Sequence, residues 1–207
     1  VALQTIGIDL GAFFAAGAVF AVGLGFAMQN IAQNFVSGVI LLLERSIKPG
    51  DILEVQGRLV RVDELGIRST VARSRDDEEL IIPNTELVQS IVKNFTHKDN
   101  SFRIRASVGV SYDTDLDFAQ QTLQSIAKTH TTQHPDSNPS VALTEMADSA
   151  IIFEVSVWSV DPWNVQREKS ELLMAIWRGL RDAQIDIPYP QLDVHAGPTL
   201  VQALKTS

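Results

Sequence analysis

The stretch VGLGFAMQNIAQNFVSG, from Val22 to Gly38, lies inside a longer run, Leu10 to Leu43, that contains no Asp, Glu, Lys or Arg. A charge-free run of this length is typical of a membrane segment and rare in soluble chains. The run is also rich in Gly and Ala, and it carries four amide side chains near its middle, at Gln29, Asn30, Gln33 and Asn34. The sequence therefore predicts a membrane helix with two features to explain, its small residues and its central amides.

The run is too long for one straight crossing of a bilayer. As a continuous helix it would extend roughly 50 Å at 1.5 Å per residue, whereas the hydrocarbon core is about 30 Å thick. We expect one crossing over Leu10–Met28 and a more amphipathic second piece over Phe35–Leu43 that lies along the interface. A kink is expected between or within these pieces, at Gln29, Asn30, Asn34 and Gly38.

Small residues recur along the run at helical spacing. Gly17, Ala21 and Gly25 are four residues apart. In lipid such rows let helices approach closely, because packing rather than the hydrophobic effect drives helix association there. The alternative, one helix buried in a soluble core, is disfavoured by the length of the run without a charge.

Flanking charge predicts the orientation of the helix. Only Asp9 precedes the run, whereas basic residues follow it at Arg45, Lys48, Arg58 and Arg61. The positive-inside rule then places the C-terminal side in the cytoplasm.

Composition narrows the function classes. The chain has 207 residues, 45% of them apolar, no Cys and a formal net charge of −8. Disulfides and Cys-based zinc sites are excluded, and the acidic balance disfavours a nucleic-acid partner. His130 and His134 have metal-ligand spacing, but no carboxylate accompanies them and Pro135 follows. No nucleophile–base pair or Gly-rich phosphate loop is evident, so we expect no enzyme, no metal and no cofactor.

Short strand-like runs follow the turn Pro49-Gly50-Asp51. Their spacing predicts a small all-β barrel (Sm/SH3-like) or sandwich over residues 47–98. The expected strands are ILEV (52–55), RLVRVDEL (58–65), IRSTVARS (67–74), ELIIP (79–83) and SIVKNF (90–95).

The remainder alternates strands with amphipathic helices. Strands are expected at 102–112, 141–147 and 150–160, helices at 113–129 and 163–183, and a closing extended segment at 186–195. This β-α-β-β-α-β order predicts an α+β, ferredoxin-like domain over 99–195, followed by a tail at 196–207. The membrane helix and its kink form the first segment, 1–46.

Four stretches resemble one family, the small-conductance mechanosensitive ion channels (MscS-like), and they occur in the family's order. The resemblance is carried by VGLGFAMQNIAQNFVSGVILLLERSIKPGD (22–51), LIIPN (80–84), GVSYDTDLD (109–117) and IPYPQLDV (187–194). It implies a homoheptameric channel of the bacterial inner membrane with cytoplasmic C-terminal domains, opened by membrane tension to release ions and small osmolytes during hypoosmotic shock.

The resemblance also implies roles for residues of the run. Val22 and Phe26 fall on the apolar pore constriction, where a narrow ring of apolar side chains excludes water and therefore ions. Positions at which neighbouring pore helices pack fall on Ala15, Ala18, Ala21, Gly23 and Gly25. The implied partners are further copies of the chain, membrane lipids, and the ions and osmolytes that pass.

The sequence departs from the family pattern in four places. Val22 and Phe26 replace the frequent Leu pair, Asn30 replaces a Gly, and Ser46 replaces the Pro of an Arg-Pro pair. The family's preceding transmembrane helices have no counterpart in these residues, so we expect this chain to be part of a longer sensor. Two alternatives stay open: that Phe26 faces lipid or a neighbouring helix, and that Gln29 and Asn34 form hydrogen bonds between subunits rather than facing ions. So does a different function, a non-conducting membrane-anchored oligomeric scaffold or ligand-binding module.

Overall fold

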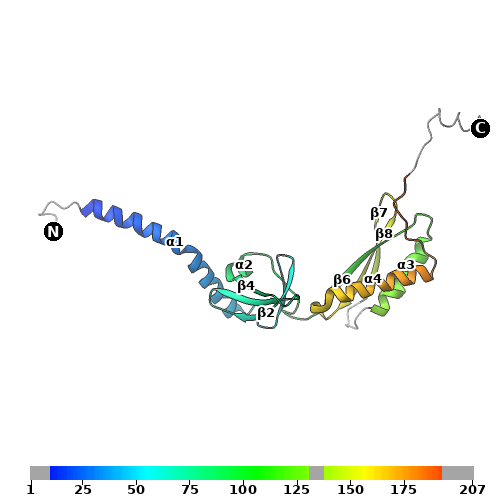
Figure 1. Cartoon of the computed structure of the whole chain (residues 1–207), viewed down its shortest axis with the longest axis horizontal. Coiled ribbons are helices and arrows are strands. Elements are labelled where there is room, and N and C mark those ends of the chain that lie inside the picture. Colours follow the sequence, from blue (N-terminus) through cyan, green and yellow to red (C-terminus); the bar gives the residue numbers. More distant parts are fainter. Residues whose placement is uncertain (1–9, 131–137, 193–207) are drawn as a thin grey trace, which may run out of the picture. The chain divides into compact units, whose positions relative to one another are not determined.

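The computed structural model describes residues 10–130 and 138–192, and the chain forms two compact units, Val1–Asn100 and Ser101–Ser207 (Figure 1). His134, the end of the expected closing segment at 193–195 and the expected tail at 196–207 lie outside the described residues.

The charge-free run forms α1 (Leu10–Glu44), which Figure 1 draws as one uninterrupted coil. Helical structure continues through all four expected kink positions, so the run is not divided into two separate helices. One amide supports the helix, because the side chain of Asn34 donates to the main-chain oxygen of Asn30 at 2.9 Å, along the helix rather than away from it. The helix ends at Arg45, which has a φ of 52° and donates to Leu41 O at 3.0 Å, a left-handed C-terminal cap.

The five strands expected after α1 are present, and they form one antiparallel sheet in the order β4-β3-β2-β1-β5. Their bounds are β1 (Ile52–Val55), β2 (Arg58–Leu65), β3 (Ser69–Ser74), β4 (Glu79–Pro83) and β5 (Lys93–Asn94). Gln56 and Gly57 join β1 to β2 with φ values of 50° and 76°, as a two-residue hairpin requires. Alternate residues of β1 and β3 face a core that also buries Leu41 of α1.

A short helix was missed by the sequence analysis. α2 (Asn84–Gln89) directly follows β4, between the strands expected at 79–83 and 90–95. Six residues are too few to show a helical period in the sequence. Leu87, on the inner side of α2, is buried in the core of the β domain.

The second unit holds a three-stranded antiparallel sheet in the order β6-β8-β7. Helices α3 and α4 pack on one face of this sheet, and their buried residues share one core with it. The bounds are β6 (Phe102–Val110), α3 (Leu116–His130), β7 (Ser140–Met146), β8 (Ile151–Ser159), the short 3₁₀ helix η2 (Pro162–Asn164) and α4 (Val165–Asp182). The strand and helix order β-α-β-β-α is as expected.

The fourth strand of the ferredoxin-like pattern is not formed over 186–192, and that expectation is wrong for these residues. Pro188 and Pro190 lack the N–H that a ladder needs at alternate positions. The segment is held by separate hydrogen bonds instead. Ser111 N donates to Asp186 O at 3.1 Å, and Gln191 N donates to Ser149 Oγ at 3.0 Å.

Candidate pore segment and its junction with the β domain

The two expected constriction residues lie on the exposed part of α1. Val22 is 59% exposed and Phe26 is 73% exposed within a single chain. Four residues apart, they project about 40° from one another around the helix. Both side chains can therefore point toward one axis, although one copy of the chain cannot form a ring.

The helix has the composition of a membrane span. The segment Gly11–Glu44 is long and apolar enough to cross a membrane, and its most apolar part is not covered by the rest of the described chain. A core helix of a soluble domain would instead be covered by its own fold. Large apolar side chains such as Phe13, Phe14 and Phe20 are more than two-thirds exposed, so this surface needs lipid or protein around it.

The small residues of this part of α1 are not required by the chain's own packing. A β-carbon added to Gly17, Gly23 or Gly25 would meet nothing within 4 Å. The three expected packing alanines, Ala15, Ala18 and Ala21, are likewise exposed. Only a contact outside this chain can give these small side chains a packing role.

Gly38 differs from the other glycines of α1. It is buried, and a β-carbon there would overlap the carbonyl group of Ile67 and lie 2.5 Å from Nδ2 of Asn84. Glycine at this position lets α1 approach the β2–β3 turn closely. The structure therefore assigns Gly38 a packing contact with the β domain, a role that the expected kink did not include.

The amides of α1 have different environments. Gln29, Asn30 and Gln33 are exposed, whereas Asn34 is half-buried. The Oδ1 atom of Asn34 accepts hydrogen bonds from Thr85 N at 3.2 Å and from Thr85 Oγ1 at 3.1 Å. Asn34 thus satisfies a free N–H in the first turn of α2, and its partner lies within the same chain.

Asn84 organises the other side of this contact. Its fully buried side chain donates to Gly66 O at 3.0 Å and to Ile67 O at 3.1 Å, and accepts from Thr70 Oγ1 at 2.9 Å. The β2–β3 turn is therefore fixed where Gly38 packs on it. We call Asn34, Gly38, Asn84 and Thr85 the junction. Sequence reasoning missed Asn84, although it ends the LIIPN motif.

A second set of hydrogen bonds holds the chain just after α1. Asp51, only 8% exposed, accepts from Lys48 N at 3.0 Å and from Asn94 Nδ2 at 2.8 Å. Its other oxygen accepts from Thr96 Oγ1 at 3.2 Å. The turn that leaves α1 is thereby tied to β5 and to the segment after it.

The remaining candidate groups lie apart from α1. In the β3–β4 hairpin, Arg73 donates to Asp77 at 3.1 Å and to Asp63 at 3.2 Å, and these contacts raise the pKa of Arg73 above its ordinary value, the Asp77 hydrogen bond most strongly. No group of three or more His, Asp or Glu side chains suited to a metal occurs among the described residues. His130 lies in the last turn of α3.

The class of the chain is defined by an exposed apolar helix, long enough to cross a membrane, followed by an all-β domain and an α+β domain. Two family models match it in that order. The model for the mechanosensitive ion channel beta-domain matches residues 30–97, and the model for the C-terminal part of the mechanosensitive ion channel MscS matches residues 104–187.

Curated relatives agree with these matches. A small-conductance mechanosensitive channel of Edwardsiella ictaluri is 33% identical over 184 residues, 88% of this chain and 62% of that protein. The mechanosensitive channel MscK of Escherichia coli is 30% identical over 178 residues, 86% of this chain and 16% of that protein. The chain thus spans less than two-thirds of the length of either relative.

Solved structures show the same fold. MscS of Helicobacter pylori in a closed state superposes with a TM-score of 0.81 at 23% identity, over 95% of this chain and 77% of that one. Arabidopsis thaliana MSL1 superposes with a TM-score of 0.71 at 15% identity, over 90% and 69%. The chain belongs to the MscS family of mechanosensitive ion channels.

Proposed function

We propose that the protein containing this chain is an ion channel that membrane tension opens, releasing ions and small osmolytes when a cell swells. One observation carries the proposal: α1 has no charged residue from Leu10 to Leu43, its first part is not covered by its own chain, and its C-terminal part is docked to the β domain. The family membership supports the same activity. A non-conducting scaffold has no observation in its favour beyond those that a channel also explains.

In the proposed assembly, α1 helices from seven copies surround one axis and turn Val22 and Phe26 toward it. Two rings of apolar side chains then leave the neck dry, and ions cannot cross without water. Gly17, Gly23 and Gly25, with the exposed alanines, provide the faces on which neighbouring helices pack. The basic residues after α1 support a cytoplasmic location for both following domains, and the family supports the bacterial inner membrane.

The junction gives this arrangement a mechanical link. Asn34 and Gly38 lie 8 and 12 residues after the proposed constriction residue Phe26, on the same unbroken helix. A rotation or tilt of α1 in the membrane must therefore move the β2–β3 turn and α2, or break the contacts of Asn34 with Thr85. The β domain thereby favours one orientation of the pore helix.

Pressure recording tests the proposal. Full-length protein is reconstituted in liposomes, and suction is applied to excised patches, with protein-free liposomes as the control. We expect stepwise currents that begin above a threshold of suction and show weak ion preference. Assembled protein that conducts nothing up to the pressure at which the patches rupture would contradict channel activity and leave the scaffold reading.

A further inference from the structure

The chain enters and leaves the β domain at neighbouring points. It enters through residues 46–51, which follow the end of α1, and it leaves through residues 94–96, at the end of β5. We call these the entry segment and the exit segment. The side chain of Asn94 donates to Ser46 O at 3.3 Å, so the two segments are in direct contact.

Asp51 binds both segments with one carboxylate. Its Oδ2 accepts from Lys48 N in the entry segment at 3.0 Å and from Asn94 Nδ2 in the exit segment at 2.8 Å. Its Oδ1 accepts from Thr96 Oγ1 at 3.2 Å. Asp51 is buried, and hydrogen bonds to a charged group are stronger than those between neutral groups. Because a buried carboxylate that loses one partner is left poorly satisfied, we expect these bonds to break together.

The exit segment depends on these side chains more than on the sheet. β5 is only two residues long, shorter than an ordinary strand, and one further main-chain bond joins Phe95 N to Ile52 O at 3.0 Å. Thr96 adds two bonds, because its N–H donates to Asn94 Oδ1 at 2.9 Å and its Oγ1 accepts from Ile52 N at 3.0 Å. We call Asp51, Asn94 and Thr96 the clasp.

Along the chain, the clasp lies between α1 and the second unit. Ser46 is two residues beyond Glu44, the last residue of α1. After Thr96, the exposed residues 97–100 lead to the second unit, which begins at Ser101. A movement of the second unit that pulls on residues 97–100 therefore reaches the clasp first and, through Asp51, the end of α1. The junction is a separate connection, since it joins α1 to the β2–β3 turn and α2.

We propose that the clasp couples the second unit to the pore helix. While its bonds hold, the end of α1 and the exit segment move together; when they break, the second unit no longer acts on α1. Asp51 is a positioning residue, which acts on the pore only through α1. The effect on opening rests on the proposed channel function, whereas the joint opening of the two segments does not depend on conduction.

Hydrogen exchange tests whether the two segments open together. Full-length protein in detergent is compared with Thr96→Val, which keeps the size of the side chain but removes the hydroxyl. Backbone N–H groups of both the entry and the exit segment should exchange at least about ten-fold faster, as expected for the loss of a hydrogen bond to a charged group. Unchanged exchange in β2 and β3 shows that the β domain stays folded.

Thr144→Val is the matched control, since the Thr144 hydroxyl donates to Ile152 O in the second unit and takes no part in the clasp. It should leave exchange in both segments unchanged. Asp51→Ala removes the carboxylate itself and should accelerate both segments at least as much as Thr96→Val does. Faster exchange in only one of the two segments overturns the clasp, because the segments then open independently.

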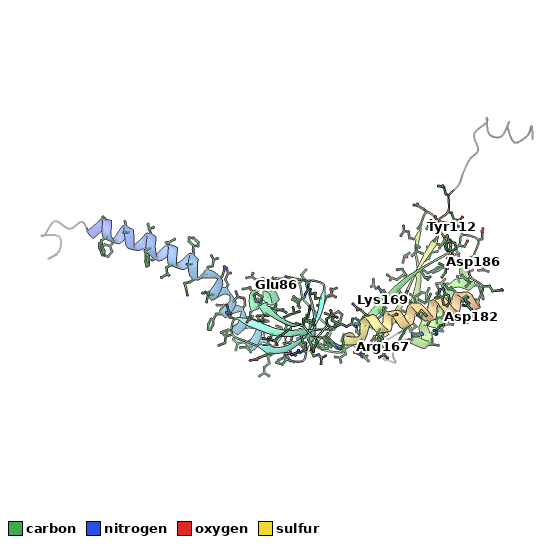
Figure 2. All side chains as sticks on the ribbon, viewed as in Figure 1. Glu86, Tyr112, Arg167, Lys169, Asp182 and Asp186 are labelled. Atoms are coloured by element: carbon green, nitrogen blue, oxygen red, sulfur yellow. The ribbon has the colours of Figure 1, made fainter. Side chains whose placement is uncertain are left out.

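A load on the second unit tests the effect on opening. Lys169 is exposed on α4, where Figure 2 labels it, and the 207 residues contain no Cys. Lys169→Cys therefore gives one attachment point in them for a large polyethylene glycol. In liposome patches the attached polymer should shift the threshold suction. With Thr96→Val added the shift should be less than half as large, whereas with Thr144→Val added it should be undiminished. Equal shifts in these two backgrounds, or no shift in any, overturn the coupling.

The two proposals fail separately. If both segments open together in Thr96→Val while no variant conducts under suction, the clasp stands as a structural link and the channel proposal falls. If pressure-dependent currents are recorded but the shift caused by the polymer does not depend on Thr96, the coupling alone falls.

Discussion

Asn34 shows why an amide belongs in an apolar helix. Exposed to lipid, its side chain would lack partners, and an unpaired amide in an apolar environment costs several kcal/mol. Here it donates to Asn30 O and accepts from two donor atoms of Thr85, so both ends of the amide are satisfied. Asn34 therefore lies at the point along α1 where the exposed part of the helix ends and the part that contacts the β domain of its own chain begins.

Asn84 is the residue on which the β domain depends most for its hydrogen bonds at the junction. Asn84→Ala leaves the carbonyl groups of Gly66 and Ile67 and the buried hydroxyl of Thr70 without this partner. We expect the free energy of unfolding of the β domain to fall by about 3 kcal/mol. Thermal unfolding of the purified protein measures this as a lower midpoint. Asn30→Ala, at an exposed side chain, is the control and should melt like the parent; an unchanged midpoint for Asn84→Ala would refute the role given to Asn84.

Phe26 carries the proposed dry neck. Phe26→Ser places a hydroxyl in the ring, so water enters more easily and the channel should open at clearly lower suction. Phe20→Ser is the matched control, because Phe20 is about as exposed, 72%, but projects about 120° away from Phe26 around α1. Threshold pressure in liposome patches is the measurement. If the two variants shift the threshold equally, Phe26 faces lipid or a neighbouring helix rather than the pore.

At the scale of the element, α1 divides into two parts by its packing. Up to residue 33 it is exposed on all sides, whereas Ser37, Gly38 and Leu41 are buried against the β domain. Hydropathy predicted the helix, but it could not predict this division, because every residue of the run is uncharged. The contacts that define it come from Asn84 and Thr85, about 50 positions further along the chain.

The other elements show the same limit of local signals. Strands with clear alternation, such as β1 and β2, fall where the sequence predicted them. α2 was missed because it is only six residues long, and its place is set by Leu87 in the core and Asn34 at its first turn. The prediction of a closing extended strand within 186–195 did not take account of Pro188 and Pro190, which cannot donate a hydrogen bond to a sheet. The roles of Val22 and Phe26 stay predictions, since they depend on other copies of the chain.

Gly38 provides a test of the division of α1. Gly38→Ala puts a methyl group against the carbonyl of Ile67, so the helix and the β2–β3 turn must move apart. We expect a loss of about 2 kcal/mol in the free energy of unfolding, as for other overpacked sites. Gly17→Ala should leave the unfolding of the β domain unchanged, because its β-carbon meets nothing within 4 Å in its own chain and lies away from the junction. Thermal midpoints of both variants decide the matter, and equal midpoints would mean that Gly38 does not pack as described.

For the whole molecule, the exposed apolar surface of α1 is the feature that the packing of a single chain does not explain. A single helix of this kind in a bilayer is covered by lipid, which explains its apolar side chains but not its glycines at Gly17, Gly23 and Gly25. Close packing of identical helices explains both. Such packing closes into a ring when each copy contacts the next by the same rotation and these rotations add up to one full turn.

Two properties of the proposed ring can be tested: the number of chains in it and the side chains that lie at its centre. We expect the mass of the full-length protein in detergent, after subtraction of bound detergent, to equal seven chains. Oxidation of a Val22→Cys variant should then join neighbouring copies, because side chains at a closed constriction approach within the few ångströms that a disulfide requires. One cysteine per chain can form only pairs, so an odd-membered ring must leave at least one chain of each assembly unpaired even at full oxidation.

Phe20→Cys is the control for this experiment, since Phe20 projects from the opposite side of α1 and should pair poorly. Complete conversion of Val22→Cys to pairs would indicate an even-numbered assembly. Pairing through position 20 but not through position 22 would move the axis to the other face of α1. Val22 and Phe26 would then contact lipid, and a different set of side chains would have to hold the pore dry.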